Sequence, residues 1–308
     1  MTDYSNKLLY IDADTLIVAS AAKEEQNRCL AKHLPTGREK LFESKTEFNT
    51  WLKENPKWKK EDFEFTNIKE LTGNIKFACH SFKLKLQNIL DAIPHKDFFV
   101  CIQGEGNFRK TIGAKYVQYK AQRSEKPLLF QELYDWVKVK YKHRCIVIDG
   151  EETDDFVCRK ANEGHIVAFC DKDIPANCVG HLFNYNKPEE GVFFNTDESR
   201  WSKYWTQVLV GDSIDNVDGI LKLADQTKLD YNIKTKGVGG ATAEKILKGC
   251  ASEKEAAERV LEAYLLAYPE DGFERMQEMC LFLHMRRYEE EMFDLASYLN
   301  KLGVEYGS

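Results

Sequence analysis

The chain has 308 residues, of which 43% are hydrophobic, so it can build one large domain or two smaller ones around a real core. It has no apolar run long enough for a membrane span and no signal-peptide pattern, and its nine cysteines show no CxxC spacing. We therefore expect an intracellular protein without a disulfide framework or zinc site. A net charge of −6 argues against a nucleic-acid partner, unless local clusters of bases outweigh the total.

The first predicted element is a short apolar strand over residues 7–11, which Asp12 and Asp14 follow at once. A helix is expected over residues 15–22. Asp12 lies at the junction between the strand and the helix, and taken alone it fits a structural role as well as a functional one. Asp14 could simply cap the helix.

Residues 28–72 are the least readable part of the chain. The pattern over residues 28–44 is typical of a hairpin that turns at Pro35 to Gly37. The charged stretch that follows, with Trp51 and Trp58, favours a solvated helix and loop with aromatic anchors, although such a surface can also track a nucleic-acid strand. Residues 75–93 predict a helix whose apolar stripe belongs to the core.

A buried strand is predicted over residues 98–102, and a basic segment over residues 105–127 follows it. This segment has no continuous helical stripe and mixes lysine and arginine with aromatic residues. A mobile basic loop beside a site would suit a phosphate backbone, and an ordinary exposed loop is the alternative. A helix over residues 128–140 comes next.

Two acidic turns flank the centre of the chain. The strand over residues 144–148 precedes Glu152, Asp154 and Asp155, and after a helix a second strand ends in Asp171 and Asp173. A right-handed βαβ unit makes the two strands parallel, so both turns lie at the carboxyl edge of one sheet. Carboxylates crowded there would repel one another unless a cation joined them, and a divalent metal is the simplest candidate. Helix capping explains the first turn as well, but not the second.

The later part of the chain reads as a hairpin turning at residues 188–191, a helix ending near Val210, and then Asp212 and Asp215 three residues apart. On a helical turn this spacing would put both carboxylates on one face. Residues 217–234 look like a charged insertion with a short helix. The tail over residues 252–303 is expected to be helical in three segments.

Three glycines precede a helix predicted to start near residue 241: Gly237, Gly239 and Gly240. Glycines let backbone N–H groups point outward at a helix N-terminus, which makes an anion site. The segment lacks the Gly-Lys-Ser/Thr ending of a P-loop, and no strand leads into it as in a dinucleotide fingerprint. A flexible hinge is the alternative interpretation.

The ordered set of motifs IDAD, YKAQR, EETDD, CDKD, GDSIDN and KGVGGATAEKIL resembles the metal-dependent 5′-nuclease (flap endonuclease) superfamily, and within it the phage 5′→3′ exonucleases most. The resemblance implies an α/β fold with a central, mainly parallel sheet flanked by helices, and a C-terminal helical region with a helix–hairpin–helix element. It implies a nuclease domain over residues 1–205 with a basic arch-like loop near 105–127. A helical DNA-binding region would occupy residues 206–308, with the helix–hairpin–helix near 235–248.

Position by position, the resemblance implies three groups of site residues. The metal ligands it implies are Asp12, Glu152, Asp154, Asp155, Asp171, Asp173, Asp212 and Asp215. Of these, Asp12, Glu152 and Asp154 would chiefly serve a first ion and Asp171, Asp173 and Asp212 a second, with Asp155 and Asp215 bridging or further out. The catalytic cations would be Lys120 and Arg123, which hold the scissile phosphate. The DNA-binding residues would be Arg109, Lys110, Tyr119, Gly237, Gly239, Gly240 and Lys245.

Two departures from the family pattern stand out. The family has an aspartate just after the second strand, where this chain reads Gln103-Gly104-Glu105, so either Glu105 replaces it or the first ion has one ligand fewer. The insertion over residues 217–234 also separates the last aspartate pair from the glycine segment.

We therefore expect a two-metal hydrolase that cuts DNA from or near a 5′ end and leaves 5′-phosphate products. The sequence does not decide whether exonuclease, flap endonuclease or RNase H activity dominates. The implied cofactors are two Mg²⁺ ions, with Mn²⁺ as a substitute and K⁺ at the glycine segment. The implied partner is DNA with a 5′ end or flap, or an RNA–DNA hybrid, bound by a monomer in the cytoplasm (the host's, if a phage encodes the chain). The alternatives are a PIN-like ribonuclease and a non-catalytic, structure-specific nucleic-acid-binding protein.

Overall fold

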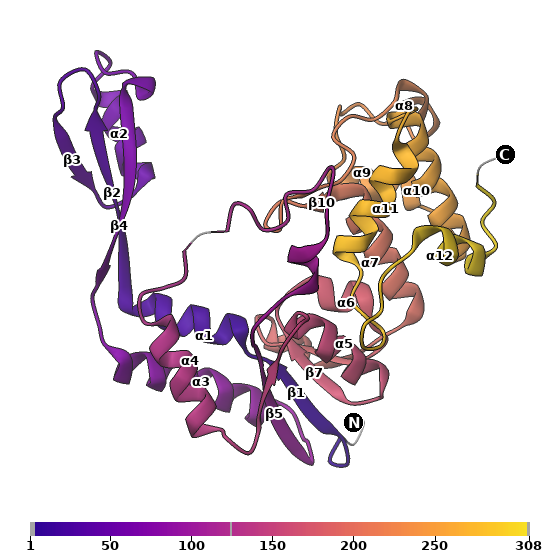
Figure 1. Ribbon diagram of the computed structural model, residues 1–308, viewed down its shortest axis with the longest axis horizontal. Coiled ribbons are helices and arrows are strands. Elements are labelled where there is room, and N and C mark those ends of the chain that lie inside the picture. The colour runs from indigo at the N-terminus through magenta and orange to yellow at the C-terminus, as the bar shows by residue number, and fades with distance from the viewer. Residues whose placement is uncertain (1–3, 124, 307–308) are drawn as a thin grey trace. The chain divides into compact units, whose positions relative to one another are not determined.

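A computed structural model describes residues 4–123 and 125–306 of the chain (Figure 1). The chain divides into two compact units. The first unit comprises Met1–Asp14, Ile89–Ser124 and His143–Ser308, and the second comprises Thr15–Asn88 and Glu125–Lys142. No helix among the described residues is both long and apolar enough to cross a membrane.

A six-stranded sheet forms the centre of the first unit. Its strands are β1 (Leu8–Asp12), β5 (Asp97–Gln103), β6 (Cys145–Ile148), β7 (Ile166–Phe169), β8 (Gly180–Asn184) and β9 (Val192–Asn195). They lie in the order β6-β5-β1-β7-β8-β9, all parallel except β9, which runs antiparallel to β8. The predicted α/β class with a central, mainly parallel sheet is confirmed, and so is the hairpin that turns before Gly191.

The strand register brings the ends of β1, β5 and β6 to one edge of the sheet. Asp12 pairs with Cys101, and Gln103 at the end of β5 pairs with Ile148 at the end of β6. Helix α5 (Thr153–Asn162) begins just after β6, and α6 (Asp173–Asn177) begins just after β7. The two acidic turns therefore lie at the carboxyl edge of one parallel sheet, as the βαβ pattern predicts.

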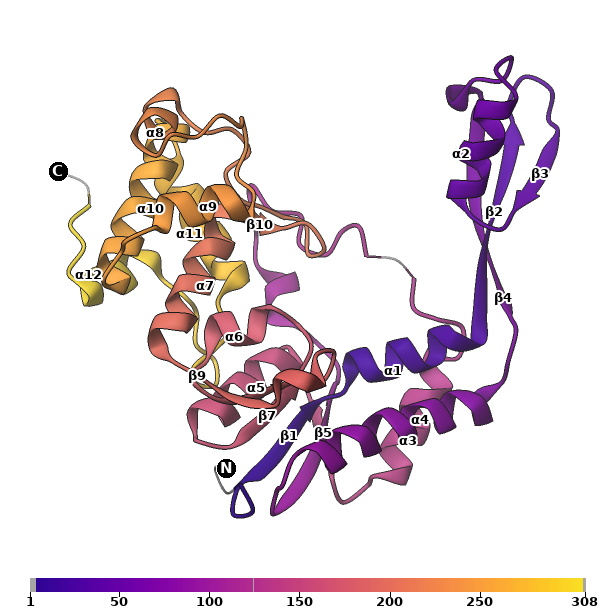
Figure 2. The ribbon, with the colours of Figure 1, turned by 180° about the vertical axis from the view of Figure 1, so that it is seen from behind.

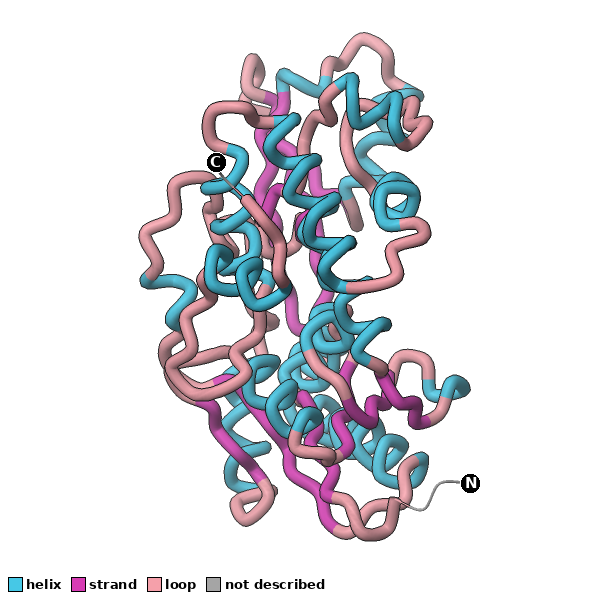
Figure 3. The backbone as a smooth tube through the Cα atoms, turned by 90° about the vertical axis from the view of Figure 1, so that its right-hand side faces the viewer, coloured by secondary structure: helices cyan, strands magenta, loops and turns pink. Residues whose placement is uncertain are grey.

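Helices make up most of the rest of the first unit. They are α7 (Asp197–Val210), α8 (Asp225–Asp230), α9 (Gly240–Leu247), α10 (Glu253–Ala267), α11 (Gly272–Leu283) and α12 (Leu295–Leu302), cyan in Figure 3. Trp205 on α7 and Tyr264 on α10 are fully buried in one apolar cluster that these helices share. The domain boundary predicted after residue 205 falls inside α7, because this helix continues to Val210 and packs with the C-terminal helices.

Two local predictions were wrong. Asp212 and Asp215 lie on a tight hairpin between β10 (Gly211–Asp212) and β11 (Val217–Asp218), not on a helical turn. Gly211 has a φ of +79°, which ends α7 and reverses the chain. In the tail, the second of the three helical segments was predicted over residues 273–288, but α11 ends at Leu283 and His284 is already extended.

The second unit contains a small antiparallel sheet with its own core. Its strands, in the order β3-β2-β4, are β2 (Glu25–His33), β3 (Glu39–Phe42) and β4 (Phe63–Leu71), with α2 (Lys45–Glu54) beside them in Figure 2. Phe42 and Phe48 are buried in this core. The predicted turn at Gly37 is confirmed, with φ of +67°. Strand β4 was not predicted, because its alternating residues looked like a charged loop.

The remaining helices are α1 (Asp14–Ala21), α3 (Ile75–Ala92), α4 (Phe130–Lys140) and the short 3₁₀ turns η1 (Ala22–Glu24), η2 (Lys60–Asp62), η3 (Phe108–Thr111) and η4 (Pro188–Glu190). The predicted apolar stripe of α3 is confirmed, since Cys79, Phe82 and Leu86 are buried. In the second unit, Phe82 makes an edge contact with Trp136 of α4, with the ring centres 6.3 Å apart.

Candidate active site

Four aspartates gather at the carboxyl edge of the sheet without an ion-pair partner: Asp12, Asp154, Asp171 and Asp173. Asp12 ends β1 and is 3% exposed, and its Oδ1 accepts the N–H of Asp14 at 3.3 Å. Asp171 follows β7, and its Oδ1 accepts the N–H of Asp173 at 3.1 Å. Within residues 4–123 and 125–306, no lysine or arginine lies within ion-pair distance of these four carboxylates.

Burial and mutual repulsion raise the pKa of all four carboxyl groups. Burial is the largest cause at Asp12 and at Asp154. Repulsion follows, from Asp14 and then Asp171 at Asp12, and from Asp12 and then Asp171 at Asp154. Burial, then repulsion by Asp171 and Asp212, raises the pKa of Asp173 to about 7. Carboxylates that repel one another in this way are stabilised in their charged form only when positive charge comes among them.

The other four predicted metal ligands are each engaged by a cation. Glu152 receives Lys120, Arg109 at 3.3 Å and the hydroxyl of Tyr119 at 2.7 Å. Asp215 pairs with Lys120 at 3.4 Å and with Arg123 at 3.2 Å. Asp212, 4% exposed, pairs with Lys172 at 3.2 Å. Burial opposes ionisation of Glu152, but Arg109 and Lys120 hold the pKa of its carboxyl below the usual value.

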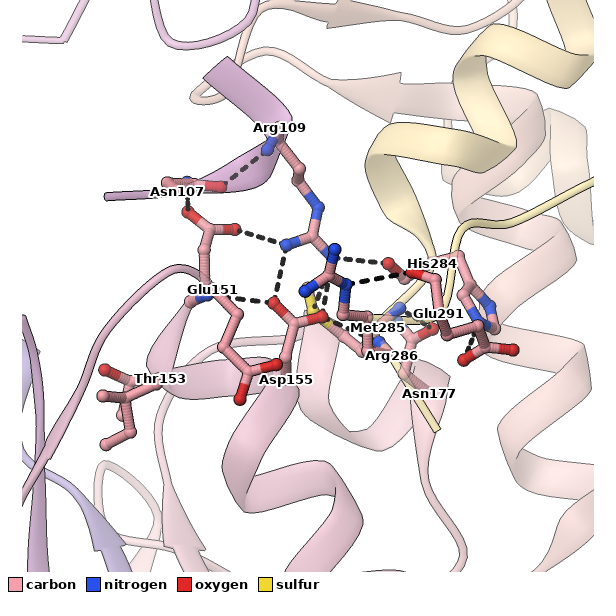
Figure 4. Close-up of polar contacts among 12 residues, drawn as sticks. Asn107, Arg109, Glu151, Thr153, Asp155, Asn177, His284, Met285, Arg286 and Glu291 are labelled. Carbon is pink, nitrogen blue, oxygen red and sulfur yellow. Dashed lines mark hydrogen bonds and ion pairs between the residues drawn. The ribbon is translucent and has the colours of Figure 1, made fainter. Parts of the chain in front are cut away.

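Asp155 has a different environment from the remaining acids. Its two oxygens accept hydrogen bonds from Arg109 at 2.6 and 2.8 Å, and Oδ1 also accepts the N–H of Arg286 at 2.7 Å. Figure 4 shows this arrangement, in which the guanidinium also donates to the backbone oxygen of His284. Asp155 is 0% exposed, so its lone pairs are directed to protein donors.

Arg109 was predicted to contact DNA, and the structure contradicts this, because the residue is 1% exposed. It is instead the internal counter-ion of α5 and links that helix to the segment after α11. The sequence around Glu152 and Asp155 does not indicate that these acids pair with an arginine more than 40 positions earlier in the chain. Neighbouring Lys110 is exposed, in agreement with a surface role.

The basic loop places its two predicted catalytic cations beside the acids. Lys120 has a φ of +57°, and its N–H donates to the backbone oxygen of Asp215 at 2.9 Å. Its side chain is 8% exposed, whereas that of Arg123 is 57% exposed. The loop is therefore tied to the β10–β11 hairpin, and both cations touch Asp215.

Glu278 on α11 anchors the same loop and has no sequence signal. Its carboxylate accepts the backbone N–H groups of Lys115 at 2.8 Å and of Tyr116 and Val117 at 2.6 Å. Tyr119 stacks on Phe282 of α11, with the ring centres 4.9 Å apart. These contacts fix the approach of the loop to the carboxylates.

At the position of the missing aspartate, a side chain would require Val147 and Asp149 to move. A Cβ on Gly104 would lie 2.8 Å from Val147 and even closer to Asp149. Gln103 instead bridges the strand ends, since its Nε2 donates to the Glu151 oxygen at 2.7 Å. Glu105 is exposed, and its N–H donates to Asp149 at 2.6 Å.

The glycine segment forms an open approach to α9. A Cβ on Gly239 or Gly240 would meet nothing within 4 Å, whereas one on Gly237 would lie 3.0 Å from the oxygen of Leu221. Lys245 donates to the backbone oxygen of Asn232 at 3.2 Å. Short helices α8 and α9 flank the segment, and its role as a helix–hairpin–helix stays a prediction.

The donor chemistry of the cluster fits a hard divalent cation. All its candidate ligands are carboxylates, and Mg²⁺ prefers oxygen ligands and retains several of its waters. Among the described residues, no three acidic, histidine or cysteine side chains lie close enough to form a ready-made metal site. The fit is therefore one of charge and donor type, with water-mediated ligands and side-chain adjustment needed.

No family model and no curated protein sequence matches this chain. In structure, the chain is similar to the T5 D15 protein co-crystallised with metal ions, with a TM-score of 0.40 and 11% identity over 88% of this chain and 97% of that one. It is also similar to a variant of the bacteriophage T5 D15 flap endonuclease in a pseudo-enzyme–product complex with DNA and metal ions (TM-score 0.35, 12% identity, 67% and 90% covered). A variant of the T5 5′-exonuclease gives a TM-score of 0.35 and 13% identity over 67% and 91%. The function proposed below rests on the residues of this chain.

Proposed function

We propose that the protein is a metal-dependent phosphodiester hydrolase that cuts DNA from or near a 5′ end and leaves a 5′-phosphate. The observation that carries the proposal is the group of four unpaired aspartates at the carboxyl edge of the sheet. Lys120 and Arg123 are close to this group, because both pair with Asp215. Keeping four such carboxylates ionised costs free energy, because they are partly desolvated and repel one another. A bound divalent metal ion would offset this cost.

Two divalent ions, when bound, supply an activated water and neutralise charge on the attacked phosphate and the leaving oxygen. Asp12 and Asp154 would hold the first ion, and Asp171, Asp173 and Asp212 would hold the second. Gln207 orients Asp173 by donating to its Oδ1. Asp155 stays paired with Arg109 and fixes the start of α5, so that the preceding residue, Asp154, stays at the carboxyl edge of the sheet.

The cations of the basic loop bind the substrate phosphate. In the absence of substrate, Asp215 and Glu152 hold Lys120, and Asp215 holds Arg123. Phosphate oxygens offer these groups charge-assisted contacts of the same kind as a carboxylate does, so Arg123, the more exposed of the two, turns to the phosphate first. Glu152 then keeps Lys120 directed at the reacting phosphate.

A non-catalytic nucleic-acid-binding protein is the second candidate. The observation that favours it is the lack of space at Gly104, which leaves the first ion without the ligand expected there. The other aspartates of the cluster favour the hydrolase. The glycine segment before α9 favours a DNA duplex over the RNA substrate of a PIN-like ribonuclease.

The test uses a duplex with a single-stranded 5′ flap labelled at the 5′ end, with matched RNA and RNA–DNA versions. The protein is incubated with Mg²⁺, with Mn²⁺ or with EDTA. We expect metal-dependent release of labelled fragments, whose lengths distinguish stepwise exonuclease from flap cutting. Binding of the flap without cleavage in either metal would reject the hydrolase in favour of the binding protein.

A further inference from the structure

A cleft of about 580 Å³ lies next to the carboxylate cluster and has no role in the proposed reaction. The end of β7, helix α6, strand β9 and helix α7, all labelled in Figure 2, contribute to its walls. Its volume is within the range of sites for small organic ligands. The cleft adjoins the cluster, because Lys172 on its wall pairs with Asp212 at 3.2 Å and Gln207 donates to Asp173.

Three lysines at the cleft carry exposed positive charge: Lys172, Lys187 and Lys203. Lys187 is 58% exposed and pairs with Glu190 at 3.2 Å. Lys203 donates to Asn195 Oδ1 at 3.1 Å and to Ser199. No carboxylate among the described residues lies within ion-pair distance of Lys203, and the acceptors of its ammonium are the neutral oxygens of Asn195 and Ser199, which leave its charge uncompensated.

The interior of the cleft is apolar and aromatic. Phe169 and Phe193 contribute rings that meet edge to face at 6.4 Å, and Pro175 lies beside them. Phe169 is buried, whereas Phe193 is partly exposed and lines the cleft. An aromatic ring of this kind stacks on a planar heterocycle such as a nucleobase.

Among the described residues that line the cleft, Gln207 alone carries a buried side-chain polar atom without a hydrogen-bond partner. The side chain is 7% exposed, and its Nε2 is committed to Asp173. With Asp173 ionised, this contact sets the orientation of the amide, because only the NH₂ group can donate to a carboxylate. The opposite atom, Oε1, has no donor within residues 4–123 and 125–306, although buried acceptors are nearly always satisfied.

A lysine-lined mouth, an aromatic wall and a buried acceptor match the phosphate, the ring face and the amine of a nucleotide. We propose that the cleft binds one nucleotide whose base carries its exocyclic amine at the position of adenine N6 or cytosine N4. The base lies against Phe193, its amine donates to Gln207 Oε1, and its phosphate contacts Lys187 and Lys203. The fit of the cleft to a nucleotide is independent of the proposed function. Only the assignment of that nucleotide to a DNA strand rests on the proposed function.

The same geometry discriminates against thymine. Thymine presents its O4 acceptor where cytosine presents its N4 amine, so two acceptors would face each other at Gln207. Turning the NH₂ group inward would give up the Nε2 contact with the Asp173 carboxylate, which disfavours that orientation while Asp173 is ionised. We expect dCMP to bind at least about tenfold more tightly than dTMP, as one well-placed base contact provides.

The test is calorimetric titration of the full-length protein with dCMP and with dTMP in EDTA, which separates binding from cleavage. Lys187→Ala and Phe193→Ala should each weaken dCMP binding about tenfold or more, in folded protein checked by thermal melting. The matched controls are Lys254→Ala, an exposed lysine of α10, and Phe194→Ala, the neighbour that packs on His181 with the rings 5.1 Å apart. Both controls should bind dCMP as the wild type does.

Absence of dCMP binding, equal affinity for dCMP and dTMP, or wild-type binding by the Lys187→Ala and Phe193→Ala variants would overturn the proposal. A 5′-phosphorylated oligo(dC) that binds more tightly than dCMP supports a DNA strand as the source, and equal affinity contradicts it. The two proposals fail separately. A protein that cuts the flap without binding dCMP refutes only the cleft, and one that binds dCMP without cutting refutes only the hydrolase.

Discussion

Asp154 is the residue at which carboxylate crowding is greatest. Asp12, Asp171, Glu152 and Asp173 all raise the pKa of its carboxyl, after burial as the largest cause. We predict that Asp154→Asn increases the free energy of unfolding of the metal-free protein by about 1 kcal/mol or more, since one pKa unit corresponds to roughly 1.4 kcal/mol. Urea denaturation in EDTA measures this change. An exposed acid at the end of α5 gives the control, Glu163→Gln, which should change stability little.

The same substitution should lower metal-dependent cleavage by more than about 100-fold, because even residues behind a metal ligand typically contribute 10- to 100-fold. DNA binding in EDTA should be unchanged. An Asp154→Asn protein that cleaves at the wild-type rate would contradict the two-ion assignment, whatever its stability.

Arg109 is the residue whose loss should cost most stability. Its guanidinium is buried with Asp155 at 2.6 Å, and removing one partner leaves the other charge buried and unpaired. Arg109→Met should lower the free energy of unfolding by about 3–5 kcal/mol, and Arg109→Met/Asp155→Leu should recover much of it. Arg144→Met, whose surface pair with Asp97 is about half exposed, should cost less than about 1 kcal/mol. Equal losses in the two single variants would refute a structural role for Arg109.

At the scale of single residues, the sequence predicted which acids gather but not which of them are neutralised. Asp12 ends β1, Asp171 follows β7, and Asp154 lies in the first turn of the helix after β6, and parallel strands bring such positions to one edge. The pairing of Asp155 with Arg109, or of Glu152 with Lys120, depends on how a loop folds back across the sheet, and no local pattern encodes that. Gln207 lies on the buried face of α7, where its polarity alone gave no signal.

At the scale of elements, the basic loop depends on α11 for its position. Because Glu278 accepts three successive N–H groups of the loop, Glu278→Gln should weaken that anchor and open the loop more often. Limited trypsin digestion should then cleave faster after Lys115, Lys120 and Arg123. Glu274→Gln, an exposed neighbour on α11, should digest as the wild type does, and equal rates in the two variants would contradict the anchor.

The buried strands and long amphipathic helices were predictable, whereas short and charged elements were not. Helix α3 was predicted to within one residue, because its apolar stripe is continuous over five turns. The β10–β11 hairpin has two residues a strand, and its shape comes from the positive φ of Gly211 and Asn216. Strand β4 is defined by its pairing with β2, a non-local contact that its own residues do not reveal.

At the scale of the whole molecule, the β2–β3–β4 module begins and ends at one point. Glu25 pairs with Leu71, and Thr72 donates to the backbone oxygen of Glu24 at 2.9 Å. Replacing residues 26–70 with an Asn-Gly turn should therefore leave the rest folded, because the module has its own core and the turn closes the same strand pair. Circular dichroism melting and the flap cleavage assay measure the result. Loss of folding would show that the module is part of the main core.

Binding of metal to the carboxylate cluster is the most direct test of the proposed function. Calorimetric titration of the DNA-free protein with Mn²⁺ and with Mg²⁺, compared with the Asp154→Asn/Asp171→Asn double variant and the Glu163→Gln control, measures it. We predict that the wild type and the control bind two ions and that the double variant loses at least one of them. A wild type that binds no divalent metal, or a double variant that binds as many ions with the same affinity, would contradict the proposed function.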